Sequence, residues 1–275
     1  MEIKKEKNSS LRHVLLQSWD VCVKNTQTLF LTMAYDVLFF IALGFVTRPL
    51  FDRIIAYAQA VFAVLGKKAP ELVQAAAKGE STVMLPGTSA YLWKLVLVYL
   101  VLFVVVYLVY SFIEGLAWRN TAKLFSSQQA FSQYLLPFFR LSLVWVFLFG
   151  IYHLFTLYLD YRVLVAAQGN PYPALLTALR YFCVLFFGYF IIVTYAALPW
   201  RKTIGSAVGF AWQHFSDFAF TYIFIWVVFI LLQFVLIAAF RLSNTVGIIA
   251  GMILVLPWLS FVRVLLMQKC VLVEG

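Results

Sequence analysis

An acidic residue lies near the middle of a long apolar stretch of this chain. Asp36 falls within Thr28–Val46, which is long enough to cross the hydrocarbon core of a bilayer as a helix. An ionised carboxylate at that depth costs about 3 kcal/mol or more unless it is paired or hydrated. Asp36 therefore predicts a proton or cation site or, as the favoured alternative, a bond between helices to a Tyr, to Gln233 or to an Arg.

A second polar group follows one face of a later apolar stretch. His153, Thr156 and Asp160 are spaced i, i+3 and i+7, and Arg162 lies just beyond them. Such a stripe can conduct protons or form a polar packing seam, and the seam is the favoured interpretation. One His and one Asp two turns apart are a poor ligand set, so no metal site is predicted. Gln233 predicts a hydrogen bond between helices.

Recognised catalytic motifs are missing from this sequence. It contains no P-loop, HExxH, GxSxG or Cys/His zinc cluster, so no catalytic residue and no cofactor is predicted. Glu114 and Arg119 lie five residues apart, slightly off the best helical pairing distance, so an ion pair between them is one option at the inner membrane surface. We expect a protein that is not an enzyme.

The composition requires lipid as the solvent for most of the chain. Of its 275 residues, 64% are hydrophobic and only 12% are charged, whereas soluble domains carry roughly 25% charged residues. This excludes a cytosolic enzyme, a disordered protein and a disulfide-rich secreted protein. The net charge of +10 comes from Lys and Arg between the apolar stretches, where they face lipid headgroups. Membrane lipids are the expected partners, and nucleic acid is not.

Six apolar stretches are long enough to span a membrane as helices, and their continuous hydrophobicity argues against a β-barrel. Lys and Arg are more numerous on the side of the two termini, which predicts a cell-membrane protein with both termini in the cytoplasm. The predicted spans are Thr28–Val46, Leu95–Ile113, Leu141–Leu159, Tyr181–Pro199, Phe218–Phe240 and Val246–Val262.

The connections between these spans differ in length. Residues 168–171 and 243–245 form short outer turns, which force the helices on either side to pack antiparallel. The first outer connection, residues 47–90, is long. Its apolar residues recur at helical spacing from Leu50 to Leu65, which predicts an amphipathic helix ended by Gly66, followed by a shorter helix from Pro70 to Gly79.

The ends of the second and fourth spans share a Trp-Arg-x-Thr sequence. The Trp and Arg are expected at the lipid headgroups, and the Thr is expected to cap the following helix. Any multi-pass protein carries Trp and Arg at its helix ends, but the added Thr and an Ala-aromatic pair further on favour a true repeat. The copies are Trp118, Arg119 and Thr121, then Trp200, Arg201 and Thr203, with Trp258 and Arg263 as a looser third.

The chain is therefore predicted to be all-α, a polytopic transmembrane bundle of six helices in three repeated units. Each unit is an in-plane amphipathic helix followed by a transmembrane hairpin. The units cover about residues 8–118, 119–200 and 201–269 of a single membrane domain, 1–275. Trp19, Phe131 and Trp212 are the expected membrane anchors of the in-plane helices.

The pattern that runs from Ser18 and Trp19 to Lys24 and Asn25, with its two later copies, resembles a group of uncharacterised prokaryotic six-helix membrane proteins. In these proteins an amphipathic helix precedes each pair of spans, and the membrane domain of some glycerophosphoryl diester phosphodiesterases is similar. The resemblance covers the whole chain and implies this architecture. It does not imply phosphodiesterase activity, since the sequence contains no such catalytic domain, and it transfers no functional residue.

Three functions are open to a chain of this kind. The favoured one is a non-catalytic scaffold or an accessory subunit of a membrane complex, with a membrane-protein partner or a second copy of the chain as its partner. The alternative is a transporter, channel or lipid-moving protein that uses Asp36 and the His153/Asp160 stripe. The third, a membrane-embedded enzyme acting on lipid, lacks a recognisable catalytic set.

Overall fold

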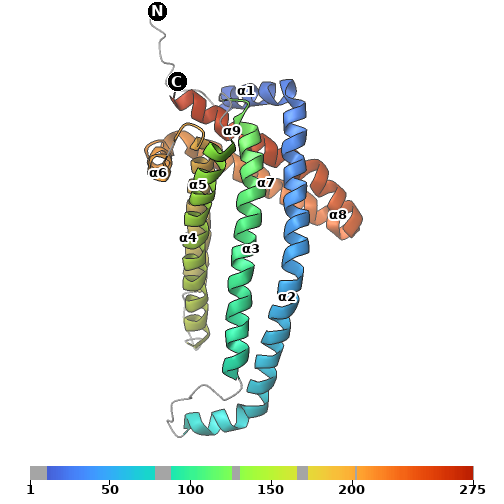
Figure 1. The fold of residues 1–275 in the computed structure, drawn as a ribbon, viewed down its shortest axis with the longest axis vertical. Coiled ribbons are helices and arrows are strands. Elements are labelled where there is room, and N and C mark those ends of the chain that lie inside the picture. Colours follow the sequence, from blue (N-terminus) through green and yellow to red (C-terminus); the bar gives the residue numbers. More distant parts are fainter. Residues whose placement is uncertain (1–10, 78–87, 126–130, 166–172, 202, 275) are drawn as a thin grey trace, which may run out of the picture. The chain divides into compact units, whose positions relative to one another are not determined.

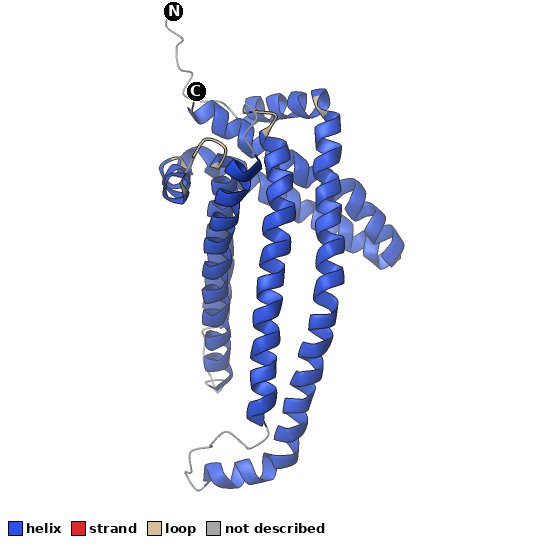
Figure 2. Cartoon of the chain, in the orientation of Figure 1, coloured by secondary structure: helices blue, strands red, loops and turns tan. Residues whose placement is uncertain are grey.

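The computed structural model describes residues 11–77, 88–125, 131–165, 173–201 and 203–274, and these ranges form helices joined by turns, without a strand (Figures 1 and 2). The all-α prediction is confirmed. The helices are α1 (Leu11–Lys24), α2 (Thr26–Ala77), α3 (Thr88–Ala122), α4 (Phe131–Val165), α5 (Pro173–Ala197), α6 (Ile204–Gln213), α7 (Phe215–Leu242), α8 (Asn244–Ala250), a π-helical turn η1 (Gly251–Val255) and α9 (Leu256–Glu274).

Among the described residues, six helical segments are long and apolar enough to cross a bilayer. Each overlaps one of the six predicted spans. Many large apolar side chains on these helices are exposed, for example Phe45 and Phe220, and only lipid can cover so much apolar surface. The protein is therefore a multi-pass membrane protein. The segments are Thr26–Val64, Ser89–Ala122, Gln133–Thr156, Thr177–Ala197, Phe215–Leu242 and Asn244–Val273.

The chain divides into two compact units, residues 38–110 and residues 1–37 with 111–275. The smaller unit is a hairpin of α2 and α3. Its core is Ile54 from α2 against Val98 and Leu102 from α3. The ring of Phe39 meets the ring of Tyr110 edge-on, with 6.0 Å between the centroids. These apolar contacts hold the hairpin together, and none of the described charged side chains of this unit is buried.

The predicted amphipathic helix in the first outer connection is not a separate element. α2 continues without interruption from its membrane span through Gly66 and Pro70 to Ala77, so the expected stop at Gly66 is wrong. Figure 1 shows the last turns of α2 bent aside. Pro70 lacks the backbone N–H that would bond to the carbonyl of Gly66, and proline in a helix commonly produces such a bend. Gly79, the predicted end of the second helix, lies outside the described residues.

The larger unit begins with α1, which lies crosswise to the first turns of α2 (Figure 1). Between them, the Asn25 side-chain amide donates to the carbonyl of Val21 at 2.9 Å and closes the turn. One stripe of α1, formed by Val14, Ser18 and Cys22, is buried. This helix packs against α9, so the first and last helices of the chain lie together.

The last hairpin turns at Ser243, as predicted. Ser243 has an extended backbone, and its hydroxyl accepts from the N–H of Val246 at 3.1 Å, which caps α8. A Cβ at Gly247 would overlap the ring of Phe240, so glycine allows α7 and α8 to approach closely. The π-helical turn η1, which is wider than an α-helical turn, comes just before Pro257. Pro257 has no backbone N–H and so cannot donate an α-helical hydrogen bond. The other predicted turn, at 168–171, lies outside the described residues.

Buried polar bonds tie α4, α5 and α6 together. The indole N–H of Trp145 in α4 donates to the hydroxyl of Thr194 in α5 at 3.2 Å. The Tyr195 hydroxyl of α5 donates to that of Ser142 in α4 at 3.0 Å. The Tyr189 hydroxyl donates to the carbonyl of Ala211 in α6 at 2.9 Å. Polar groups inside a membrane bundle need such partners, so these bonds position the three helices.

Candidate functional site

Three charged side chains from different helices meet inside the larger unit. Arg263 of α9 donates from Nη1 to Oδ2 of Asp36 in α2 at 2.9 Å, and from Nη2 to Oδ1 at 2.6 Å. The same Nη2 donates to Oε2 of Glu114 in α3 at 2.8 Å. We call Asp36, Glu114 and Arg263 the charge cluster. It links the first long helix, the next one and the last.

The charge cluster is shielded from solvent and lipid. The side chain of Asp36 is 1% exposed, that of Arg263 is 6% exposed and that of Glu114 is 11% exposed. The guanidinium carbon of Arg263 also lies 5.8 Å from the ring centroid of Trp118, which gives a cation–π contact. A planar guanidinium bound by both oxygens of a carboxylate is geometrically demanding, so the cluster constrains how the helices rotate and slide.

Two carboxylates share one guanidinium in this cluster. Asp36 accepts hydrogen bonds from Arg263 through both of its carboxylate oxygens, whereas Glu114 accepts through one. With all three groups ionised, the cluster carries one net negative charge. A buried ion pair is weak evidence for stability, but removing one partner strongly destabilises the fold because the other charge stays buried and unpaired. Both acids therefore depend on Arg263.

A second polar contact joins α2 and α3 close to the charge cluster. The amide Nδ2 of Asn120 donates to the carbonyl of Thr28 at 2.9 Å and to the hydroxyl of Thr32 at 3.0 Å. Thr32 lies one turn before Asp36 in α2, and its side chain is fully buried. This contact fixes α3 beside α2 and thereby places Glu114 within reach of Arg263.

Two buried serine hydroxyls lie one turn from the charge cluster. Ser111 precedes Glu114 by three residues in α3, and Ser260 precedes Arg263 by three in α9, which places each serine on the same helix face as its charged neighbour. Both side chains are at most 1% exposed. Neither hydroxyl has a hydrogen-bond partner within the described part of the chain. Unsatisfied buried hydroxyls are uncommon and require an explanation.

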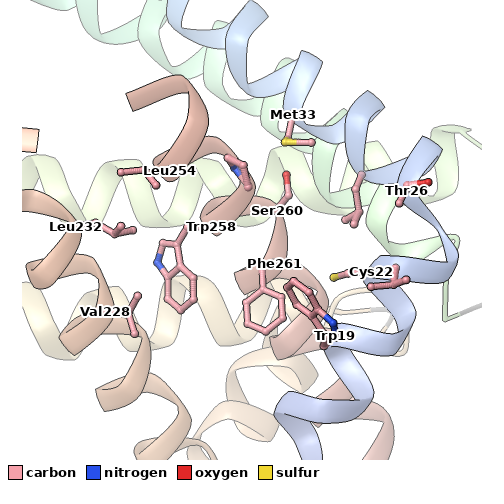
Figure 3. Close-up of a pocket in the computed structure, with 13 residues that line it drawn as sticks. Trp19, Cys22, Thr26, Met33, Val228, Leu232, Leu254, Trp258, Ser260 and Phe261 are labelled. Carbon is pink, nitrogen blue, oxygen red and sulfur yellow. The ribbon is translucent and has the colours of Figure 1, made fainter. Parts of the chain in front are cut away.

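An apolar pocket of about 450 Å³ lies beside Ser260 (Figure 3). Its walls come from α1, α2, α7, η1 and α9. They include Trp19, Met33, Leu232, Leu254, Trp258 and Ser260. Met33 lies one turn before Asp36, so the pocket and the charge cluster occupy adjacent turns of α2 and α9.

The structure changes the expected roles of several charged residues. Of the partners considered for a bond between helices, Asp36 binds an arginine, Arg263. Arg263 was expected at the lipid headgroups, but it is buried because it serves two carboxylates. Glu114 was considered as a partner of Arg119 and instead binds Arg263. The guanidinium of Arg119 lies 5.2 Å from the ring centroid of Phe131.

The polar stripe predicted on the third span does not form a connected path among the described side chains. The Thr156 hydroxyl donates back to the carbonyl of His153 at 2.8 Å, and His153 itself is exposed. The carbonyl of Thr156 accepts from Nη2 of Arg180 at 3.4 Å, which joins α4 to α5. The side chain of Asp160 lies outside the described residues. Gln233 is exposed on α7, and no hydrogen bond joins its side chain to the residues that the structure describes.

The expected headgroup residues occupy different environments. Trp118 is buried at 5% exposure, whereas Trp200 and Trp258 are half-buried. The guanidinium of Arg201 lies 5.1 Å from the ring centroid of Phe210. Sequence reasoning missed Asn120, Ser111 and Ser260. The signal available was the i, i+3 spacing that puts each serine on the face of a charged residue.

No protein family, no curated protein and no solved structure matches this chain. The described residues also contain no group of three or more His, Cys, Asp or Glu side chains that could hold a metal ion. The charge cluster, the polar contacts next to it and the apolar pocket are the features of the described residues that could support a function.

Proposed function

We propose that the protein is a non-catalytic membrane scaffold or an accessory subunit of a membrane complex. The observation that carries this proposal is the closure of the charge cluster, in which Asp36 and Glu114 bind Arg263 of the same chain. A transport site needs a side chain available to its cargo. A cluster whose charges are engaged with one another is better suited to holding three helices in register.

The exposed amide of Gln233 supports a role in assembly. It lies well inside the span Phe215–Leu242, among exposed apolar neighbours such as Leu231 and Phe234. An amide that faces hydrocarbon leaves its hydrogen-bonding groups unsatisfied, and hydrogen bonds between membrane helices contribute about 0.6–2 kcal/mol. A helix of a partner subunit or of a second copy would satisfy it.

Transport remains the second candidate because of one observation. Two carboxylates share one guanidinium, so the cluster has an excess acid that can take up a proton without losing the Asp36–Arg263 pair. A protein that moves protons or cations needs such a group within the membrane.

Reconstituted vesicles distinguish the two functions. The scaffold predicts that proton and monovalent-cation flux equals that of protein-free vesicles for wild type, Asp36→Asn and Glu114→Gln alike. Transport predicts a wild-type flux that both substitutions reduce, while Asp20→Asn, which changes an exposed acid of α1, leaves it unchanged. A wild-type flux with that dependence would refute the scaffold.

The assembly role has its own test. Cross-linking in native membranes, followed by mass determination, should give a discrete complex for wild type. Gln233→Leu should reduce its yield, because the amide that recruits the partner helix is lost. The matched control is Phe234→Leu, which changes an exposed neighbour without removing a hydrogen-bonding group. Equal yields for wild type and Gln233→Leu would contradict the proposed contact.

A further inference from the structure

We propose that the apolar pocket beside the charge cluster binds the acyl chain of a membrane lipid and that the Ser260 hydroxyl donates a hydrogen bond to its carbonyl oxygen. The inference is independent of the scaffold function. It starts from the pocket walls, which come from α1, α2, α7, η1 and α9. Figure 3 shows Met33, Leu232 and Leu254 around one part of the space, and Trp19, Trp258 and Phe261 around another.

The size of the pocket fits one long hydrocarbon chain. Its volume is about 450 Å³. An apolar protein cavity of roughly 150 Å³ holds a benzene ring, so a space three times as large corresponds to roughly eighteen carbon atoms. A flexible chain of that length is a better occupant than water, because nearly all of the lining is apolar and water needs several polar partners.

Ser260 supplies the polar end of the proposed site. Other helical hydroxyls of this protein donate to the carbonyl four residues earlier, as Ser18 does to Val14 and Thr32 does to Thr28. Ser260 does not do so, although it is 1% exposed, and its hydroxyl has no partner in the described part of the chain. It lines the pocket (Figure 3). A hydroxyl held in this way is available to an acceptor inside the pocket.

The chemistry of the walls favours an acyl chain over an aromatic or charged ligand. None of the described residues that line the pocket is charged. Cys22 and Thr26 are its other small side chains with polar atoms, and they lie toward the α1 end with the 60% exposed Trp19. An acyl chain whose carbonyl oxygen accepts from Ser260 and whose hydrocarbon lies among the apolar side chains satisfies both the polar and the apolar part of the lining.

Photolabelling of the full-length protein tests the proposal directly. The protein is reconstituted in phosphatidylcholine vesicles that contain a trace of phosphatidylcholine with a diazirine in its acyl chain. After illumination, labelled residues are located by peptide mass spectrometry. We expect label concentrated on Met33, Leu232 and Leu254 of the pocket. Label spread evenly over exposed lipid-facing residues such as Phe220 and Phe234 would overturn the proposal.

Two pairs of variants separate the pocket from its surroundings. Leu254→Trp fills the pocket and should reduce pocket labelling at least five-fold, whereas Met252→Trp adds the same bulk at an exposed position of the same turn and should not. Ser260→Ala should reduce it about five-fold, the effect of one typical hydrogen bond. Ser111→Ala also removes a buried hydroxyl that has no partner among the described residues, but Ser111 is not one of the residues that line the pocket, so this change should have no effect.

Two further outcomes would overturn the assignment. One is that Leu254→Trp leaves the pocket labelling unchanged, and the other is that Ser260→Ala does. The wild-type labelling pattern provides a test even where a variant fails to fold. A parallel experiment with a diazirine-bearing free fatty acid identifies the source of the chain. Labelling by the phospholipid indicates an esterified lipid, and labelling by the fatty acid alone indicates a free acid.

Discussion

Arg263 and Asp36 are 227 positions apart in the chain, yet they form a two-point hydrogen-bonded pair with separations of 2.9 Å and 2.6 Å. Because a carboxylate meets a guanidinium in this way only when the two groups are nearly coplanar, the pair sets the rotation and the height of α9 against α2. Glu114 extends the same constraint to α3. The pair thus joins the first long helix of the chain to its last helix.

Removing the shared guanidinium should destabilise the protein more than removing either acid. Arg263→Met leaves Asp36 and Glu114 buried without a cation, and loss of one partner from a buried pair costs about 3–5 kcal/mol. Asp36→Asn or Glu114→Gln leaves one acid still paired with Arg263, so each should cost less. The measurement is the thermal unfolding midpoint of the purified protein in detergent.

The control for this series removes every charge together. The triple variant Asp36→Leu, Glu114→Leu and Arg263→Met should recover most of the stability lost in Arg263→Met, because no uncompensated charge stays buried. The distances indicate that both acids depend on Arg263. A larger drop in the unfolding midpoint for Asp36→Asn than for Arg263→Met would contradict this.

The spans could be predicted from sequence because their signal is local. Each of the six overlaps an observed apolar helix, since continuous hydrophobicity over a membrane thickness requires no knowledge of neighbours. For Asp36, the sequence left three possible partners, a Tyr, Gln233 or an Arg, and did not identify Arg263. Arg263 follows Trp258 near the end of the last span, and that local context is the same for a headgroup-facing arginine and a buried one.

Gly247→Ala should destabilise the last hairpin. The added methyl group would overlap the ring of Phe240, so α7 and α8 must move apart or the ring must shift. Overpacking of this kind costs about 1–3 kcal/mol. Gly44→Ala is the matched control, because nothing lies within 4 Å of a Cβ at that position and alanine is the better helix former. The unfolding midpoint should fall for Gly247→Ala and stay level or rise for Gly44→Ala.

The continuation of α2 could not be predicted because the local signals oppose it. Gly66 and Pro70 are typical of a helix end and a helix start. In the structure both lie inside one helix. A helix tolerates an interior proline by bending, and packing against a neighbour decides whether it does so. That information is not in the sequence around Gly66.

The two threonines of the Trp-Arg-x-Thr sequence should respond differently to substitution. Thr203 accepts from the N–H of Ser206 at 3.2 Å and caps α6, so Thr203→Ala should cost about 1 kcal/mol and Thr203→Ser should restore it. Thr121 donates to the carbonyl of Ala117 inside α3. Thr121→Ala should therefore have a smaller effect on the unfolding midpoint. Equal effects would contradict the distinct roles of the two residues.

The Cys22 thiol should react slowly with maleimide, and its reaction rate should depend strongly on pH. Burial raises the pKa of Cys22 from 9.0 to about 11, so near neutral pH its thiolate fraction is about a hundred-fold below that of an ordinary cysteine. Between pH 9 and pH 11, Cys22 is ionised to a greater extent in the unfolded chain than in the folded protein. The contribution of Cys22 to the free energy of unfolding is thus complete below pH 9 and is lost as the pH rises toward 11.

Maleimide labelling with peptide mass spectrometry measures this reactivity. The reference is the thiol introduced by Asp20→Cys, which is exposed on the same helix. The Cys22 rate should be far lower near neutral pH and should keep rising beyond pH 9, because the folded form titrates at the higher value. A Cys22 rate that flattens at pH 9 would mean that the thiol reacts only after α1 has come away from α9, in a form where its pKa is ordinary.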